Sequence, residues 1–434
     1  MATMNDNSEN GRSLPDGWEW ITVGEIGEVK GGKRLPAGHT YSDEPTNFPY
    51  IRVKDFENGT INTSDIKYLL PETQEQIKRY IISTKDVYIS IAGTIGVTGV
   101  IPEILDGANL TENAAKICNL NSVLPKYLHY YLASSSGQAI ISEKTISTNQ
   151  PKLALFRIEQ ISVPLAPLPE QEKIVNRIEE LFSDLDAGMA ALERVLVGLK
   201  RYKASVLKAA CEGKLFENSE PENDSKLPNG WVWTTIDNLA EEKLIGLDRG
   251  RVQQIFEQTP GTFPYIKMNN VTMAGDVNHD SMAYVPASNS EVNKYKVRHG
   301  DLLFNTRNSL ELVGKTGIVK SPAQDTLFNN NLLRIRTTSD VLPEFLCFQM
   351  CSDGFRRKME LVKKSTTNVA AVYAKDLLPL PIALPPLDEQ RRIVAEVERR
   401  LSVVGEVESA VEVGLVRAGR LRQSVLRSAF EGRL

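Results

Sequence analysis

The chain has 434 residues, of which 24% are charged and 41% hydrophobic, and its mean hydropathy is -0.25. These values are ordinary for a globular protein and exclude a fibrous or wholly disordered chain. No apolar run reaches the roughly 18 residues of a membrane helix, the N-terminus lacks the apolar core of a signal peptide, and four scattered cysteines make no disulfide framework. We therefore expect a cytoplasmic protein without a membrane partner. A net charge of -4 disfavours a generally basic nucleic-acid coat protein but allows DNA binding through a local patch.

The chain is an internal duplication. The motif LPDGWEW at 14–20 returns as LPNGWVW at 227–233, and FPYI at 48–51 returns at 263–266. Four later pairs keep the same order: LPKYL with LPEFL, PLPEQ with PLDEQ, SVLK with SVLR, and EGKL with EGRL. The offset between copies drifts only from 213 to 219 residues, so few insertions separate them. Such a repeat determines how the whole fold is interpreted.

Each copy is predicted to hold a globular part, here called a head, followed by a long helix. Short β-like runs such as 86–91 and 301–304, with Gly, Pro and Asn turns between them, predict mixed α/β heads. The predicted layout is a disordered tail at 1–11, the first head at 12–168, a helix at 169–214, a linker at 215–225, the second head at 226–387, and a helix at 388–434. The expected fold class is α+β, with two mixed α/β domains joined by two long antiparallel coiled-coil helices.

A heptad pattern runs through both predicted helices. With Gln171 at position a, mostly apolar residues fill a and d over six heptads, which predicts a coiled coil. In the first helix, position a holds Gln171, Ile178, Leu185, Leu192, Leu199 and Val206, and position d holds Ile174, Leu181, Gly188, Val195, Tyr202 and Ala209. In the second, a holds Val397, Val404, Val411, Ala418 and Val425, and d holds Ile393, Val407 and Leu421, with Arg400, Gly414 and Ser428 as interruptions.

The charges along the helices favour an antiparallel pair. The first helix is mainly acidic up to Glu193 and basic after it, and the second helix ends basic. This distribution suits the helix dipole, and it also lets each acidic half meet the partner's basic half. We therefore expect the heads at opposite ends of a rod roughly 65 Å long, at ~1.5 Å per residue, related by a pseudo-two-fold axis.

No catalytic signature stands out in the sequence. Gly314-Lys315-Thr316 resembles the end of a phosphate-binding loop, but Ser309 occupies the place of the required first glycine. The four histidines are scattered singly, and Cys347 and Cys351 lack a second ligand pair, so a zinc site is not expected. There is no G-x-S-x-G elbow and no dinucleotide fingerprint. We expect no catalytic residue, metal or cofactor in this chain.

The duplicated LP-x-G-W-x-W, F-P-Y-I, P-L-x-E-Q-x-x-I-V and E-G-[KR]-L motifs resemble the DNA-specificity subunit of type I restriction–modification enzymes, over residues 13–434. The resemblance implies that each head is a target-recognition domain that reads half of a split site in double-stranded DNA. It also implies that the helices set the half-site separation and dock two methyltransferase subunits, to which restriction subunits add, for adenine methylation or cleavage. S-adenosylmethionine, ATP and Mg²⁺ are then expected in the partner subunits. Because the heads differ more than the helices do, we expect an asymmetric target.

Candidate DNA-binding residues are polar and basic residues of predicted loops, because phosphates attract Lys and Arg and base edges are read by Arg, Asn, Gln, Ser or Thr. In the first head the candidates are Lys33, Arg34, Lys54, Thr94, Asn149 and Lys152. In the second they are Arg249, Arg251, Lys267, Asn269, Asn270, Arg307, Asn308, Lys364 and Asn368. The alternative for each is an ordinary solvated loop residue. Both Trp pairs, Trp18/Trp20 and Trp231/Trp233, are expected to pack rather than to stack on bases.

The predicted methyltransferase contacts are Glu170, Gln171, Glu389 and Gln390, where each head enters its helix. Two other functions remain open at this point. One is the specificity subunit of a related bipartite system whose partner fuses cleavage and methylation, and the other is a coiled-coil adaptor whose heads bind proteins or sugars. The acidic charge argues little against DNA, since -6 of it lies in the predicted tail and linker and the rest of the chain carries +2.

Overall fold

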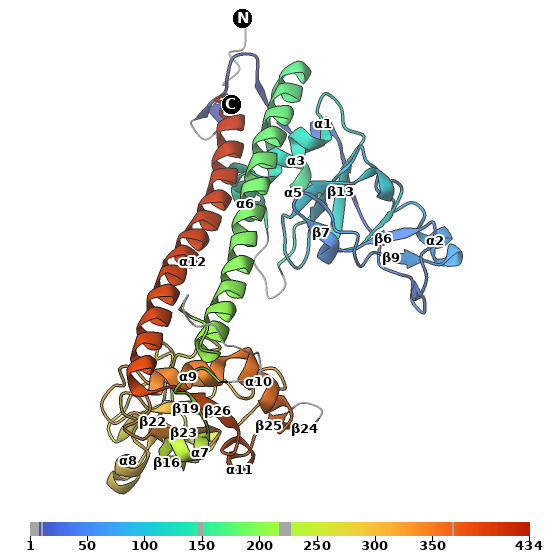
Figure 1. Ribbon diagram of the computed structural model, residues 1–434. Coiled ribbons are helices and arrows are strands. Elements are labelled where there is room, and N and C mark those ends of the chain that lie inside the picture. The colour runs from blue at the N-terminus through green and yellow to red at the C-terminus, as the bar shows by residue number, and fades with distance from the viewer. Residues whose placement is uncertain (1–7, 10–11, 146–150, 217–226, 367–368) are drawn as a thin grey trace, which may run out of the picture. The chain divides into compact units, whose positions relative to one another are not determined.

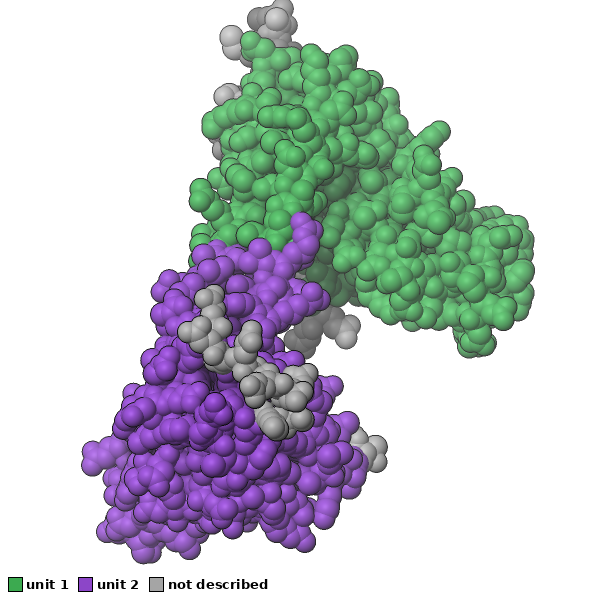
Figure 2. Space-filling model, viewed as in Figure 1, with its two compact units in different colours: residues 1–192, 412–434 green, residues 193–411 purple. Residues whose placement is uncertain are grey.

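The computed structural model describes residues 8–9, 12–145, 151–216, 227–366 and 369–434. These residues form two compact units (Figure 2): Met1–Leu192 with Glu412–Leu434, here unit 1, and Glu193–Val411, here unit 2. Each unit contains one head, one end of the first long helix and the opposite end of the second. Most of the predicted tail and linker lie outside the described residues. In the predicted tail, β1 (Ser8–Glu9) pairs with β2 (Arg12–Ser13) at the start of the first head, and Leu215 of the predicted linker is buried in a core cluster.

The two long helices are α6 (Leu168–Cys211) and α12 (Leu387–Phe430), each of 44 residues (Figure 1). Both are followed by a glycine with left-handed backbone, Gly213 with φ of 70° and Gly432 with φ of 68°. The next residue donates its N–H five residues back, from Lys214 to the Ala209 carbonyl and from Arg433 to the Ser428 carbonyl. The repeated E-G-[KR]-L motif is therefore a helix C-cap, in which glycine adopts the left-handed conformation at low cost.

The helices pair antiparallel, and each unit shows this independently. In unit 1, Asp186 near the middle of α6 lies 2.5 Å from Arg422 near the end of α12. In unit 2, Lys203 near the end of α6 lies 2.6 Å from Glu408 near the middle of α12. Each ion pair joins an acidic part of one helix to a basic part of the other, as the charge pattern predicted.

The predicted d positions of the coiled-coil seam are confirmed near the start of each helix, where Ile174 and Ile393 are buried, but are wrong farther along. Five of the predicted d residues are exposed: Gly188, Val195, Tyr202, Val407 and Leu421. The buried or half-buried face combines position a with position e, which follows position d by one residue. The residues at e on this face are Val175, Phe182, Ala210, Val394, Leu401 and Ala429. Apolar residues occupy positions a, d and e in this sequence. A stripe made of a and e repeats every seven residues, just as a stripe made of a and d does. The hydrophobic pattern therefore predicts the helices but not which side of position a faces the partner.

The first head is built from short strands in several small sheets. One four-stranded sheet has the order β11-β10-β13-β4 and another the order β12-β6-β9-β5, while β14 pairs with β3 and β7 with β8. The strands are β3 (Glu19–Thr22), β4 (Glu28–Gly31), β5 (Tyr41–Ser42), β6 (Pro49–Ile51), β7 (Phe56–Glu57), β8 (Thr60–Ile61), β9 (Lys67–Leu69), β10 (Val87–Ser90), β11 (Thr98–Val100), β12 (Asn109–Leu110), β13 (Ala114–Cys118) and β14 (Ser162–Leu165). The helices are α1 (Val23–Ile26), α2 (Pro71–Ile77), α3 (Pro125–Ala133), α4 (Ser135–Lys144) and α5 (Leu155–Glu159), with 3-10 turns at Val53–Asp55 and Glu103–Leu105.

The second head repeats this architecture. Its four-stranded sheet β16-β23-β19-β21 corresponds to β4-β13-β10-β11, and its other sheets are β18-β17-β22, β15-β26 and β20-β25-β24. The strands are β15 (Val232–Thr235), β16 (Ala240–Ile245), β17 (Thr262–Ile266), β18 (Ala283–Pro286), β19 (Leu302–Asn305), β20 (Arg307–Asn308), β21 (Thr316–Ile318), β22 (Leu327–Phe328), β23 (Leu332–Thr337), β24 (Lys364–Ser365), β25 (Ala370–Ala371) and β26 (Pro381–Leu384). The helices are α7 (Ile236–Leu239), α8 (Asn289–Tyr295), α9 (Pro343–Cys351), α10 (Asp353–Glu360) and α11 (Ala374–Leu377), with a 3-10 turn at Arg251–Gln253.

The tryptophan motif anchors each head. Trp18 is buried against Tyr127 of α3 with ring centroids 6.4 Å apart, and Trp231 is buried against Phe345 of α9 at 6.2 Å. Packing is therefore confirmed for the first tryptophan of each pair, and also for Trp20, which is half-buried against the core of the first head. Trp233 is 60% exposed, with the Lys358 ammonium 4.9 Å from its ring centroid, so the expectation of packing is wrong for this residue.

A buried histidine makes the first head sensitive to acid. His129 lies in α3 with Nδ1 3.1 Å from Thr98 Oγ1, and burial lowers its pKa to about 4. The folded state keeps this ring neutral while an unfolded histidine takes up a proton below about pH 6.5, so stability falls as the pH drops from 6.5 to 4. At 1.36 kcal/mol per pKa unit, the total loss is about 3 kcal/mol.

The matched variant is His129→Cys, because the corresponding helix of the second head carries the buried Cys347 in this place. We expect its free energy of unfolding to fall less than that of the parent between pH 6.5 and 4, by about 3 kcal/mol. Urea titrations at several pH values measure the difference. Parallel pH profiles for the two proteins would contradict a neutral, buried His129.

Candidate nucleic-acid interface

The turn after the F-P-Y-I strand is held in the same way in both heads. The Arg52 N–H donates to Asp55 Oδ2 at 2.8 Å, and the Lys267 N–H donates to Asn270 Oδ1 at 2.9 Å. Asp55 and Asn270 are both buried. The Asn270 amide also donates to the Asn278 carbonyl at 3.0 Å, so its assignment to DNA contact was wrong, because its hydrogen bonds shape the turn.

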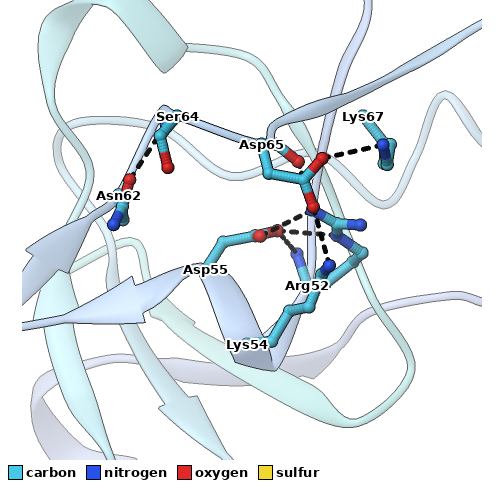
Figure 3. Close-up of polar contacts among 7 residues, drawn as sticks. All are labelled: Arg52, Lys54, Asp55, Asn62, Ser64, Asp65 and Lys67. Atoms are coloured by element: carbon cyan, nitrogen blue, oxygen red, sulfur yellow. Dashed lines mark hydrogen bonds and ion pairs between the residues drawn. The ribbon is translucent and has the colours of Figure 1, made fainter. Parts of the chain in front are cut away.

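Lys54 and Asn269 occupy the exposed corner of this turn in their respective heads. In the first head, Figure 3 shows Asp65 between the ammonium groups of Lys54, at 2.7 Å, and Lys67, at 2.8 Å. Hydrogen bonds from these two lysines hold the pKa of Asp65 well below its usual range. A phosphate that approaches Lys54 must therefore compete with the Asp65 carboxylate.

Arg52 and Lys67 were missed by the sequence analysis. The Arg52 guanidinium lies between Asp55, at 2.7 Å from Oδ1, and Asp65, so it fixes the loop instead of facing solvent (Figure 3). Lys67 pairs in the β-ladder with Tyr50 of the F-P-Y-I strand, which places it beside Lys54. The sequence did contain a signal for Lys67, because a short β-like run after the F-P-Y-I strand predicts a second strand that pairs with it.

The Gly31-Gly32 turn presents Lys33 and Arg34 from a rigid backbone. A Cβ on Gly32 would lie 2.1 Å from the Thr111 carbonyl oxygen, so only glycine fits. The Lys33 N–H donates to the Leu110 carbonyl, and the Lys33 carbonyl accepts from the Tyr50 hydroxyl. The exposed Lys33 ammonium lies 5.7 Å from the ring centroid of Tyr80. Arg34 is 75% exposed, at 3.5 Å from Glu112. Both cations are thus presented to solvent, as a DNA contact requires.

The corresponding turn of the second head uses its arginines differently. Arg249 is only 17% exposed, and its guanidinium lies 2.7 Å from Glu291 and donates to the Pro286 carbonyl at 3.1 Å. Backbone hydrogen bonding at Ser288 and the Arg249 side chain lower the pKa of Glu291 to about 2. Arg249 therefore joins this turn to α8, and its predicted contact with DNA would have to compete with Glu291. Arg251 is exposed, and Lys267 lies 5.3 Å from the ring centroid of the exposed Phe256.

The sheet β20-β25-β24 brings together three predicted residues of the second head. Arg307 and Lys364 both lie opposite Ala371 of the central strand, and Asn308 lies opposite Ala370. Arg307 and Lys364 are exposed, while Lys364 is 3.6 Å from Asp376. In the first head, Lys152 forms an isolated bridge with Ala92, and Thr94 is exposed two residues after Ala92. Asn149 and Asn368 lie outside the described residues.

Two of the predicted partner contacts are inside the protein. Gln171 and Gln390 are fully buried and hydrogen-bond the backbone of their own heads, so their assignment to partner binding was wrong. Glu170 and Glu389, one position earlier, are half-exposed. A polar residue at a helix start looked like a surface residue because its bonding partners lie about 50 residues earlier in the chain.

Within the described ranges, no helix is long and apolar enough to cross a membrane. The same ranges contain no group of three or more His, Cys, Asp or Glu side chains placed to hold a metal ion.

Comparison with known proteins decides the family. The family described as the type I restriction modification DNA specificity domain matches residues 15–193 and 248–400, which is more than half of the chain. The chain belongs to this family of type I restriction–modification DNA-specificity proteins. Such a protein supplies DNA sequence recognition to its restriction–modification system.

Relatives and solved structures agree with the family. The chain is 28% identical to the type I restriction enzyme EcoKI specificity subunit of Escherichia coli K12, over 97% of this chain and 90% of that protein. It is 25% identical to the StySPI specificity subunit of Salmonella potsdam, over 98% and 91%. A chain solved in work on the assembly and conformational transition of a type I R-M system superposes with a TM-score of 0.72 at 22% identity, over 97% of this chain and all of that one. The HsdS subunit from Thermoanaerobacter tengcongensis superposes with a TM-score of 0.56 at 21% identity, over 98% and 100%. These structures support the fold.

Proposed function

We propose that this DNA-specificity subunit reads an asymmetric, bipartite DNA target, one half with each head, and has no catalytic activity of its own. The target-recognition domains are residues 12–168 and 226–387, and the helices 169–214 and 388–434 form the spacer between them. The observation that carries the proposal is a matched scaffold with different exposed side chains. The turn held by Asp55 presents Lys54, whereas the turn held by Asn270 presents Asn269. A lysine and an asparagine offer different hydrogen-bonding groups to DNA, so the two heads suit different half-sites.

The contact residues follow from exposure. Eleven of the predicted residues are accessible enough to contact DNA: Lys33, Arg34, Lys54, Thr94, Lys152, Arg251, Lys267, Asn269, Arg307, Asn308 and Lys364. Asn149 and Asn368 stay in the proposal on sequence grounds alone. Several of these cations already have a carboxylate or an aromatic ring beside them, so DNA binding exchanges one partner for another.

Two methyltransferase subunits dock on the spacer helices in this proposal, and restriction subunits add to that core for adenine methylation or cleavage. S-adenosylmethionine, ATP and Mg²⁺ bind to those partners. Exposed apolar side chains on the outward helix faces support a docking role, since Val403 is 51% exposed and Val413 65% exposed. The half-exposed Glu170 and Glu389 lie where each helix begins, at the edge of such a surface.

Methylation mapping and duplex binding test the proposal together. Sequencing of adenine methylation in host cells with and without the gene should show one split, non-palindromic motif that loses its methylation. The full-length chain, with its methyltransferase subunit, should then bind a duplex that carries this motif, and affinity should fall with rising salt. Insertion of one or two base pairs between the half-sites should weaken binding, because each base pair turns the half-sites by about 34°. A motif that keeps its methylation, or binding that ignores the spacer, would contradict the proposal.

A further inference from the structure

The backbone pairing that follows β10 in the first head and β19 in the second is the same. In the first head, the Leu153 N–H donates to the Ile91 carbonyl at 3.1 Å, and the neighbouring residues Ala92 and Lys152 form an antiparallel bridge. In the second head, the Val372 N–H donates to the Thr306 carbonyl at 2.9 Å. There the neighbouring residues Arg307 and Ala371 are paired. Ala92 therefore corresponds to Arg307, and Lys152 corresponds to Ala371.

Each of these pairs contains one cation and one alanine, but the two heads carry the cation on opposite sides of the pair. The first head carries it on the segment before α5, at an isolated bridge, and the second carries it on β20, the strand that follows β19. Directly opposite residues of an antiparallel pair have Cβ atoms about 4.5–5.5 Å apart. A lysine or arginine side chain is longer than that, so its charged end reaches the same region from either strand. The duplicated scaffold has kept a positive charge at one place while its position in the sequence changed.

Within the described part of the chain, these two cations are free to bind a ligand. Lys152 and Arg307 are both exposed, and among the residues that the structure describes neither has an ion-pair partner. Arg34, Lys54, Arg249 and Lys364 each have a carboxylate within 4 Å. The alanine opposite each cation leaves room beside the charge.

A positive charge that both heads carry at the same place should bind a feature that is present in both DNA half-sites. Reading of a base edge depends on side-chain type, since arginine forms a two-point contact with guanine that lysine makes differently. A phosphate contact needs a positive charge at the right place and carries no sequence information. Here the residue type and the strand differ between heads, and only the charge and its place are constant.

We propose that Lys152 and Arg307 contact backbone phosphates at equivalent points of the two half-sites, and that they position the heads without reading bases. This inference rests on the proposed DNA-recognition function and adds a division of labour to it. Lys54 and Asn269, which differ in chemistry at an equivalent turn, remain the residues suited to sequence reading.

Charge relocation tests the inference. In the full-length chain with its methyltransferase subunit, Lys152→Ala and Arg307→Ala should each weaken binding about fivefold, equally for the target and for targets with single base changes. The slope of log affinity against log salt concentration should become less steep by about 0.9 for each phosphate that the variant no longer neutralises. The double variants Ala92→Lys/Lys152→Ala and Arg307→Ala/Ala371→Arg should restore both affinity and slope, because the charge returns from the opposite strand.

Lys85→Ala is the matched control, because Lys85 is exposed just before the other end of β10, and it should leave the slope unchanged. Thermal unfolding shows which variants are folded. A folded Lys152→Ala or Arg307→Ala variant with an unchanged slope, or with altered base preference, would overturn the inference. So would a folded relocation variant that stays weak. If the parent chain itself binds no split site, the proposed function fails instead, which the parent measurement reveals before any variant is compared.

Discussion

Replacement of Gln171 by alanine is expected to lower the free energy of unfolding of unit 1 by about 3 kcal/mol, since three hydrogen bonds to a buried amide are lost at about 1 kcal/mol each. The Gln171 Oε1 accepts from the Leu124 N–H at 2.9 Å, and Nε2 donates to the carbonyls of Ser122, at 2.9 Å, and Ala166, at 2.8 Å. One amide therefore joins the start of α6 to the loop before α3 and to the strand before α6.

Gln390 repeats this arrangement in unit 2. Its Oε1 accepts from the Leu342 N–H at 2.8 Å, and Nε2 donates to the carbonyls of Asp340 and Pro385, both at 3.0 Å. Hydrogen–deuterium exchange on the full chain should therefore show Gln171→Ala raising exchange in unit 1 and Gln390→Ala in unit 2. Glu172→Ala, at the exposed neighbouring position, is the control and should change little. A Gln171→Ala protein that exchanges like the parent would contradict the proposed role of the amide.

Replacement of Arg334 by methionine is expected to cost unit 2 about 3–5 kcal/mol, the usual penalty for removing one partner of a buried ion pair. The Arg334 side chain is 1% exposed, forms an ion pair with Glu242, donates to the Lys296 carbonyl at 2.7 Å and lies 3.9 Å from the buried Asp301. Without it, the Lys296 carbonyl loses a donor, and Arg336 is the one charged partner that Asp301 keeps among the described residues.

The first head supplies an intermediate variant. Lys116, at the equivalent strand position, forms an ion pair with Asp86 at 3.0 Å. Arg334→Lys should therefore keep the ion pair with Glu242 but lose the hydrogen bond to the Lys296 carbonyl, at a cost of about 1–3 kcal/mol. Lys320→Met, at an exposed ion pair, is the control and should cost at most about 1 kcal/mol. Urea unfolding followed by a probe in unit 2 measures all three, and equal losses for Arg334→Met and Lys320→Met would contradict the buried network.

The repeat, the two helices and their antiparallel pairing were predictable because each depends on patterns that are local or recur in order. The E-G-[KR]-L ending is a local cap, and the sign change along α6 is visible in one segment. The seam was not predictable to the residue, since Val195 and Leu196 are adjacent and both apolar. The sequence alone did not distinguish which of them faces α12.

Individual contact residues were harder to predict than the fold. Arg249 and Asn270 have the chemistry of DNA-contacting residues, but Glu291 and Asn278 engage them across loops. Gln171 reads as polar surface until its partners at Ser122 and Leu124 are known. Lys152 and Arg307 were each predicted, yet their equivalence depends on strand pairing across about 60 residues, which no fixed sequence offset reveals.

The division of the chain into units has a consequence for biosynthesis. Unit 2 is continuous in sequence, whereas the core of unit 1 includes Leu426, Ala429 and Phe430 from the end of α12. Domains made first usually fold first during translation. Here the ribosome makes the first head early, but that head lacks part of its core until residues 426–430 have been made. A nascent chain stopped after residue 411 would hold every segment of unit 2 and an unfinished unit 1. We therefore expect the second unit to mature before the first.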